Sequence, residues 1–167
     1  RYQHMVYTLA MRMLNHRELA EETTQDIFVK AYRSLGTFRG HSKFSTWLYR
    51  IAYRRILDVQ TRESRKPDSA TLYSESQACG QGCESTWEAL MVAERRMHLL
   101  RALDKLPPRD KSVLSLYYLQ ELNTKEIAEV TDLSISVVKV SLFRARERLK
   151  SLLESTEEGL LLRTYNT

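Results

Sequence analysis

Basic and aromatic side chains are interleaved along residues 37–66, a combination that can bind unpaired nucleic acid. The stretch holds eight Lys or Arg residues and two acidic residues. Cationic side chains track phosphates, and aromatic rings near them stack on exposed bases. The residues that carry this pattern are Phe38, Phe44, Trp47, Tyr49, Arg50, Tyr53, Arg54 and Arg62. The alternative is that Trp47 and some of the tyrosines belong to an ordinary core, as aromatics at helical spacing commonly do.

A second candidate surface lies in residues 124–148, where a short helix, a three-residue turn and a longer helix are predicted. Ala128 and Val138 can pack closely across such a turn, as in a helix-turn-helix unit. The second helix would then present Ser136, Val137, Lys139, Val140 and Ser141 to a DNA major groove, with Arg144, Arg146 and Arg148 further along. Residues 139–150 hold five basic residues and one acid. The alternative is a helical hairpin with a solvated basic face.

The charge distribution supports a polyanionic partner for the first part of the chain. The 167 residues carry a net charge of +5, of which residues 1–66 contribute +7, residues 67–104 contribute −3 and residues 105–167 contribute +1. The last third is nearly neutral, so a basic patch there must be local.

Helical periodicity runs through the chain, and three prolines and five glycines leave it almost uninterrupted. We therefore predict an all-α protein. Helices are expected over residues 2–15, 19–35 (either continuous or broken into two near Thr23–Thr24), 45–62, 85–105, 108–120, 124–130 and 135–154. Ser45 or Thr46, Ser85, Asn123 and Ser134 are the expected N-caps. In the second helix, Ile27, Phe28, Ala31, Tyr32 and Leu35 form the expected apolar face.

Residues 64–84 separate two helical domains, expected at 1–63 and 85–155, and the tail 156–167 is expected to fray. The segment is rich in serine and poor in large apolar residues, which is typical of a linker, although a long surface loop is the alternative. Cys79 and Cys83 lie within it. Two thiols need two further ligands to hold zinc, so we expect neither a metal nor any other cofactor.

The two blocks, in this order, resemble the extracytoplasmic function (ECF) group of bacterial sigma factors in the sigma-70 family. The first block runs through residues 25–32, 38–40 and 44–52. It resembles the promoter-melting domain, region 2. The second comprises 106–109, 126–129, 138–139 and 144–146 and resembles the domain for the −35 element, region 4, with a helix-turn-helix. The resemblance covers nearly the whole chain outside the linker.

The resemblance implies three sets of contacts. The set for the clamp coiled coil of the polymerase β′ subunit is Glu22, Gln25, Asp26, Phe28 and Val29. The set that captures and reads the −10 element is Phe38, Arg39, Gly40, His41, Ser42, Lys43, Phe44, Trp47, Arg50, Tyr53, Arg54 and Arg55. The set for the −35 duplex is Ser134, Ser136, Val137, Lys139, Val140, Ser141, Phe143, Arg144, Arg146 and Arg148.

The implied protein is not an enzyme but a dissociable subunit that binds core RNA polymerase, including its β flap, and promoter DNA. The family also implies an anti-sigma factor, a cytoplasmic location and no membrane insertion of the chain itself. A membrane-bound anti-sigma factor would hold it at the inner membrane face. The chain begins without Met, so the natural protein is expected to start upstream.

Three positions depart from the family pattern. Arg54 stands where Asn is common, Ser141 where Arg is common, and Glu121 where Gly is usual. A non-glycine residue with positive φ costs about 1 kcal/mol, so a slightly altered turn is expected at Glu121.

Two other functions remain open at this point. A helix-turn-helix regulator could act on duplex DNA alone, but it would need a sensory domain with strands that the first third does not show. A metal-dependent nuclease would need clustered carboxylates or histidines, which the sequence also lacks.

Overall fold

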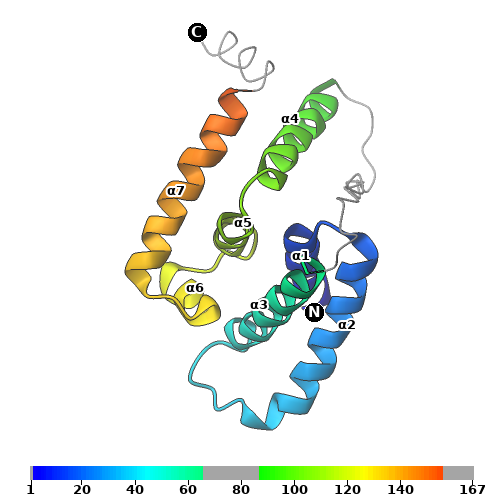
Figure 1. Ribbon diagram of the computed structural model, residues 1–167, viewed down its shortest axis with the longest axis vertical. Helices are drawn as coiled ribbons and strands as arrows, with labels where there is room; N and C mark the ends of the chain where they lie inside the picture. The colour runs from blue at the N-terminus through cyan, green and yellow to red at the C-terminus, as the bar shows by residue number, and fades with distance from the viewer. Residues whose placement is uncertain (1, 66–86, 156–167) are drawn as a thin grey trace.

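The computed structural model describes residues 2–65 and 87–155, with the side chains of the second part described from residue 94. Every regular element in these ranges is helical, which confirms the predicted all-α class (Figure 1). Several predictions lie outside the described residues. They concern the linker at 64–84 with Cys79 and Cys83, of which only Ser64 and Arg65 are described, the N-cap Ser85 and the tail 156–167. None of the described helices is long and apolar enough to cross a bilayer.

The first half consists of α1 (Gln3–Leu14), α2 (Arg17–Ser34), the short 3-10 turn η1 (Leu35–Thr37) and α3 (Phe44–Glu63). These helices pack around a shared apolar core because each carries one apolar face. The core residues are Val6, Leu9, Ala10 and Met13 from α1, Ala20, Ile27 and Ala31 from α2, and Leu48, Tyr49, Ala52, Tyr53, Ile56 and Val59 from α3.

The structure decides one open question in this half and corrects one expectation. Helix α2 is continuous, with Thr23 and Thr24 buried inside it and the Thr24 hydroxyl donating to Ala20 O at 2.7 Å. Helix α3 begins at Phe44 with Lys43 as its N-cap, so neither Ser45 nor Thr46 caps it.

The predicted apolar face of α2 also holds only in part. Ile27 and Ala31 are buried, whereas Tyr32 is 80% exposed and Leu35 is 49% exposed. Apolar residue type alone does not fix which side of a helix is covered.

The second half consists of α4 (Trp87–Asp104), α5 (Pro108–Leu114), the π-turn η2 (Ser115–Leu119), α6 (Thr124–Thr131) and α7 (Ile135–Glu154). Pro108 occupies the first turn of α5. Asn123 and Glu126 form a capping box at α6, and Ser134 caps α7 by accepting from Val137 N at 3.3 Å, as predicted.

The end of α5 differs from the predicted α-helix over 108–120. The helix widens into η2, and Glu121 then adopts a φ of 54°. Asp132, between α6 and α7, also has a positive φ, of 57°. Asp tolerates this conformation better than most residues, so it can occupy a position where glycine is the usual choice.

The two halves pack against each other in the closed arrangement of Figure 1, where α6 lies beside α3 and α5 lies beside α1. The buried apolar residues of both halves form one continuous cluster, including Ile56 of α3 and Ile127 of α6. The Tyr49 hydroxyl hydrogen-bonds to the Gln120 side chain across this junction. Burial, the main cause, raises the pKa of Tyr49, so the phenol remains protonated.

Candidate nucleic-acid interface

Four aromatic rings gather at the start of α3. The Phe38 ring centroid lies 5.6 Å from that of Phe44 and 5.4 Å from that of Trp47, and Tyr2 lies 5.4 Å from Phe44. The four side chains are half-buried, so each ring supports the others and still reaches the surface. Gly40, with a φ of 73°, bends the chain between Phe38 and α3. Such a cluster can accept an unstacked base.

The arginines of α3 point in two directions. Arg50 and Arg54 lie on its exposed face, one helical turn apart, and both contact Asp132 of the second half. Arg55 lies on another face and pairs with Asp26 of α2 at 2.5 Å. Arg50 and Arg54 thus share one face of α3, while Arg55 lies next to Asp26, one of the predicted polymerase-binding residues. Tyr53, 7% exposed, is in the core.

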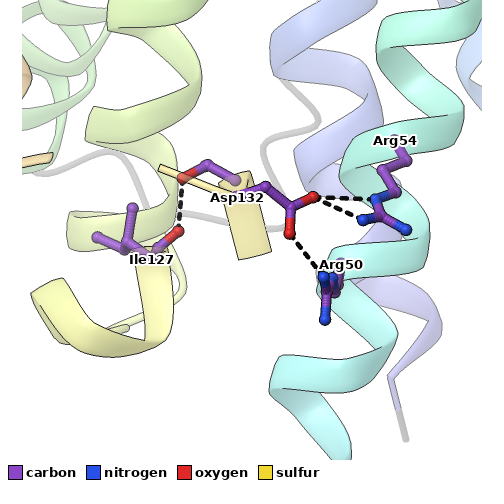
Figure 2. Close-up of polar contacts among 5 residues, drawn as sticks. Arg50, Arg54, Ile127 and Asp132 are labelled. Atoms are coloured by element: carbon purple, nitrogen blue, oxygen red, sulfur yellow. Dashed lines mark hydrogen bonds and ion pairs between the residues drawn. The ribbon is translucent and has the colours of Figure 1, made fainter. Parts of the chain in front are cut away.

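Asp132 binds both arginines at once. Its Oδ1 accepts from Arg50 Nη2 at 2.6 Å, and its Oδ2 accepts from Arg54 Nη2 at 2.6 Å and from Arg54 Nε at 3.2 Å (Figure 2). The hydrogen bonds from Arg54, and after them the positive charges of both arginines, hold the pKa of Asp132 below its ordinary value despite partial desolvation. Asp132 therefore carries its negative charge across the physiological pH range.

A second ion pair crosses the same junction. Lys43, just before α3, lies 2.9 Å from Glu126 of α6. Burial acts to raise the pKa of Glu126, but hydrogen bonds from Lys43 and from the Asn123 N–H outweigh it and hold that pKa below its ordinary value. Of the other predicted −10 residues, Arg39, Gly40 and His41 are exposed and Ser42 is half-buried.

The outer face of α7 is open to solvent. A hollow of about 610 Å³ lies between α7 and the start of α5, lined by Arg109 and Asp110 of α5 and by Ser136, Val137, Val140, Ser141, Arg144 and Arg148 of α7. Val137 is 38% exposed and Val140 48%, whereas Ser141 is only 9% exposed and lies at the helix's buried side. Phe143, 64% exposed, projects from the same helix. Apolar and cationic groups side by side suit a DNA groove bordered by phosphates.

Two of the predicted −35 arginines also have partners within the fold. Arg146 donates to the Tyr118 hydroxyl at 2.9 Å and lies 5.2 Å from the Tyr117 ring centroid. Arg148 pairs with Asp110, whose side chain is 8% exposed. Arg144 and Lys139 are exposed.

The predicted polymerase-binding residues lie along one side of α2. Glu22, Gln25 and Val29 are exposed, and Asp26 and Phe28 are half-buried. The same helix exposes Tyr32 and, just past its end, Leu35, which sequence periodicity had assigned to the core. Their burial pattern could not be read from residue type, because only the packing of α1 and α3 decides which side of α2 is covered.

Asp132 is a functional candidate that residue type and spacing did not indicate. Its partners Arg50 and Arg54 are 82 and 78 residues away, so no local spacing could signal the contact. Arg109 was part of a motif but not of the predicted −35 set, and it lines the hollow on α7.

Each half of the chain matches a known protein family. Residues 1–66 match the family described as Sigma-70 region 2, and residues 96–149 match Sigma-70, region 4. The chain is 34% identical over 155 residues to the ECF RNA polymerase sigma-E factor of Escherichia coli K12, covering 89% of this chain and 81% of that protein. The chain belongs to the ECF sigma factors.

A second relative is similar over most of its length, and two solved structures share the fold. The RNA polymerase sigma-H factor of Pseudomonas aeruginosa is 31% identical over 160 residues, covering 92% of this chain and 83% of that protein. The fold is similar to that of the sigma factor RpoE in its complex with the anti-sigma factor NepR from Bartonella quintana, with a TM-score of 0.73, 20% identity and 93% coverage of both chains. It is also similar to CnrH in complex with the cytosolic domain of CnrY, with a TM-score of 0.62, 23% identity and coverage of 92% and 83%.

Proposed function

We propose that this ECF sigma factor joins core RNA polymerase and holds a promoter at two places, with α7 on the −35 duplex and the start of α3 on the melted −10 strand. The observation that carries the proposal is that two surfaces suited to nucleic acid lie on separate halves of one chain. One combines aromatic rings with arginines, and the other is a helix-turn-helix with an open outer face. The polymerase then performs the chemistry.

The −35 surface is the outer face of α7. Val137, Val140 and Phe143 offer apolar contacts to base edges in the major groove, while Lys139 and Arg144 reach phosphates. Arg146 and Arg148 are oriented by Tyr118 and Asp110, which favours fixed phosphate contacts over flexible ones.

The −10 surface combines the aromatic cluster with Arg50 and Arg54. The rings of Phe38, Phe44 and Trp47 supply a stacking platform, and the two arginines one turn apart supply charge for successive phosphates. Unstacking a base costs a few kcal/mol, so a preformed pocket helps strand capture.

The polymerase-binding surface is the exposed side of α2. It carries Glu22, Gln25 and Asp26 next to the exposed apolar residues Val29 and Tyr32. A patch with an apolar centre and a polar rim is typical of a protein interface. We assign it to the β′ clamp, and the second half to the β flap.

A protein inhibitor is the remaining proposed partner. RpoE of Bartonella quintana and CnrH were each solved with a protein bound to them, the anti-sigma factor NepR and the cytosolic domain of CnrY. We propose that this chain is restrained by an anti-sigma factor in the same manner.

Run-off transcription with purified core enzyme on a small promoter library tests the function. We expect transcripts that appear only when this chain is added. Transcripts that do not depend on the chain would overturn the proposal, and duplex binding without transcription would favour a helix-turn-helix regulator that acts alone.

Two sets of variants test the assigned surfaces. Arg50→Ala with Arg54→Ala should impair promoter opening, followed by permanganate reactivity, more than closed-complex binding. Lys139→Ala should weaken duplex affinity and reduce its salt slope by about one phosphate contact. If the double arginine variant lost closed-complex binding and promoter opening equally, Arg50 and Arg54 would not belong to the −10 surface. If Lys139→Ala left the salt slope of duplex binding unchanged, Lys139 would not contact a phosphate of the −35 duplex.

A further inference from the structure

The outer face of α7 carries two valines that the packing of the fold does not explain. Val137 and Val140 are 38% and 48% exposed, while Val138, which lies between them in the sequence, is fully buried. Val137 and Val140 lie on one side of the helix, because residues three apart in an α-helix are neighbours on its surface. Valine is also a poor helix former, so neither burial nor helix stability accounts for valine at these two positions.

Both valines line the hollow between α7 and the start of α5. Cationic side chains reach the same hollow from both helices, with Arg109 on α5 and Arg144 on α7. Arg148 also lines it and is paired with Asp110. An apolar patch next to cations is complementary to a DNA major groove, where base edges lie between two rows of phosphates.

Four of the α7 residues in the hollow cannot make the paired hydrogen bonds that identify guanine or adenine. Those pairs need Arg or Lys for guanine and Asn or Gln for adenine. The four residues are instead two serines and two valines, Ser136, Val137, Val140 and Ser141. A serine hydroxyl bonds to any base edge and a valine side chain bonds to none, so hydrogen bonding at these positions does not select a base.

Thymine presents a methyl group, at C5, on its major-groove edge. We propose that Val137 and Val140 determine specificity for the −35 element by packing on the 5-methyl groups of thymines. This inference rests on the proposed function of α7 and specifies which duplex that surface selects.

The physical reason is the match between a rigid apolar side chain and an apolar group on the base. A β-branched side chain has a nearly fixed rotamer in a helix, so its contact with a methyl group costs little conformational entropy. Guanine, adenine or cytosine at the same place brings no methyl group and sets a polar edge against the valines, where that edge loses hydrogen bonds to water.

Two other apolar side chains of α7 are exposed without lining the hollow. Ile135 is 40% exposed at the start of the helix, and Phe143 is 64% exposed on another side of it. Phe143 could meet a thymine methyl on its own. An experiment must therefore assign the methyl contact to the valines as well as detect it.

The probe is a promoter that the chain transcribes, made as a duplex in which single thymines of the −35 element are replaced by 2′-deoxyuridine. Uracil pairs as thymine does and lacks only the 5-methyl group. We expect roughly two- to fourfold weaker closed-complex binding by the holoenzyme for at least one of these thymines, which is the loss expected for one buried methyl group. Replacement of thymines in the spacer between the two promoter elements should leave the affinity unchanged.

Val137→Ala with Val140→Ala removes the contact and keeps the helix, because alanine favours a helix more than valine does. The holoenzyme with this double variant should bind the thymine and deoxyuridine duplexes equally. Ile135→Ala is the matched control, since it shortens an exposed apolar side chain of the same helix outside the hollow. It should keep the wild-type preference for thymine, and thermal melts check that both variants fold.

The outcomes separate this inference from the proposed function. If binding depends on the −35 sequence but not on its thymine methyl groups, or if the valine double variant keeps the preference for thymine, the specificity assignment is wrong and the −35 function of α7 stands. A −35 element without thymine on either strand would overturn the assignment in the same way. If the chain gives the polymerase no binding that depends on the −35 sequence, the proposed function fails and the assignment fails with it.

Discussion

The hydroxyl of Thr46 is a buried side-chain polar atom without a hydrogen-bond partner in the described part of the chain. Thr46 is 2% exposed near the start of α3, where it was expected to cap the helix. A hydroxyl buried in this way is destabilising, and valine has nearly the same shape. We expect Thr46→Val to raise the free energy of unfolding by about 1 kcal/mol in urea titrations.

Thr24→Val is the control for that substitution. Thr24 is also buried, but its hydroxyl donates to Ala20 O, so valine should stabilise less or destabilise. If both variants changed stability equally, the difference in hydrogen bonding would not be the cause.

Arg148 and Arg144 lie one turn apart on α7 and differ in their partners. Arg148→Ala leaves the nearly buried carboxylate of Asp110 unpaired. We expect a loss of about 1–2 kcal/mol, at the low end for such pairs because Arg148 is 55% exposed. Arg144→Ala should change stability by less than about 0.5 kcal/mol while weakening duplex binding. Thermal melts and DNA titrations of both variants separate the structural and DNA-binding roles, and equal stability losses would contradict this division.

At the scale of the element, the start of α6 depends on its capping box. Asn123 Oδ1 accepts from Lys125 N at 2.9 Å and Glu126 N at 3.0 Å, and Glu126 Oε2 accepts from Asn123 N at 2.9 Å. Asn123→Ala should cost about 1 kcal/mol of folding free energy, and Asn123→Asp should restore most of it. Hydrogen exchange of the Lys125 and Glu126 amides is the local readout, and unchanged protection in Asn123→Ala would show that the cap is dispensable.

At the scale of the whole molecule, two carboxylates with lowered pKa values cross the junction between the halves, Glu126 and Asp132. In the unfolded chain they titrate near 4.3 and 3.9. Their stabilisation is therefore present above about pH 5 and is lost as the pH falls through their lower folded-state pKa values, because the unfolded state binds protons first. We expect Glu126→Gln with Asp132→Asn to flatten the rise in stability between about pH 3 and 5.

Urea unfolding across this pH range measures the effect. Glu129→Gln with Glu147→Gln removes two exposed carboxylates without touching the junction and should keep the wild-type slope. If both double variants changed the dependence of stability on pH equally, the effect would come from the net charge of the chain and not from the ion pairs at the junction.

The sequence by itself determined the helical class, most helix ends and the two blocks that match sigma-70 regions 2 and 4. The caps at Asn123 and Ser134 depend on residues within a few positions of each other, so local chemistry is sufficient to predict them. The cap expected at Ser45 or Thr46 was wrong because α3 already begins at Phe44, which places both residues inside its first turn, with Thr46 buried.

Only the tertiary structure decided which faces are covered and which charges meet. It exposed Tyr32, buried Tyr53 and brought Asp132 onto Arg50 and Arg54 across about 80 residues of chain. Burial and ion pairing between distant residues depend on how whole helices pack, and the period of a single helix carries no information about its neighbours.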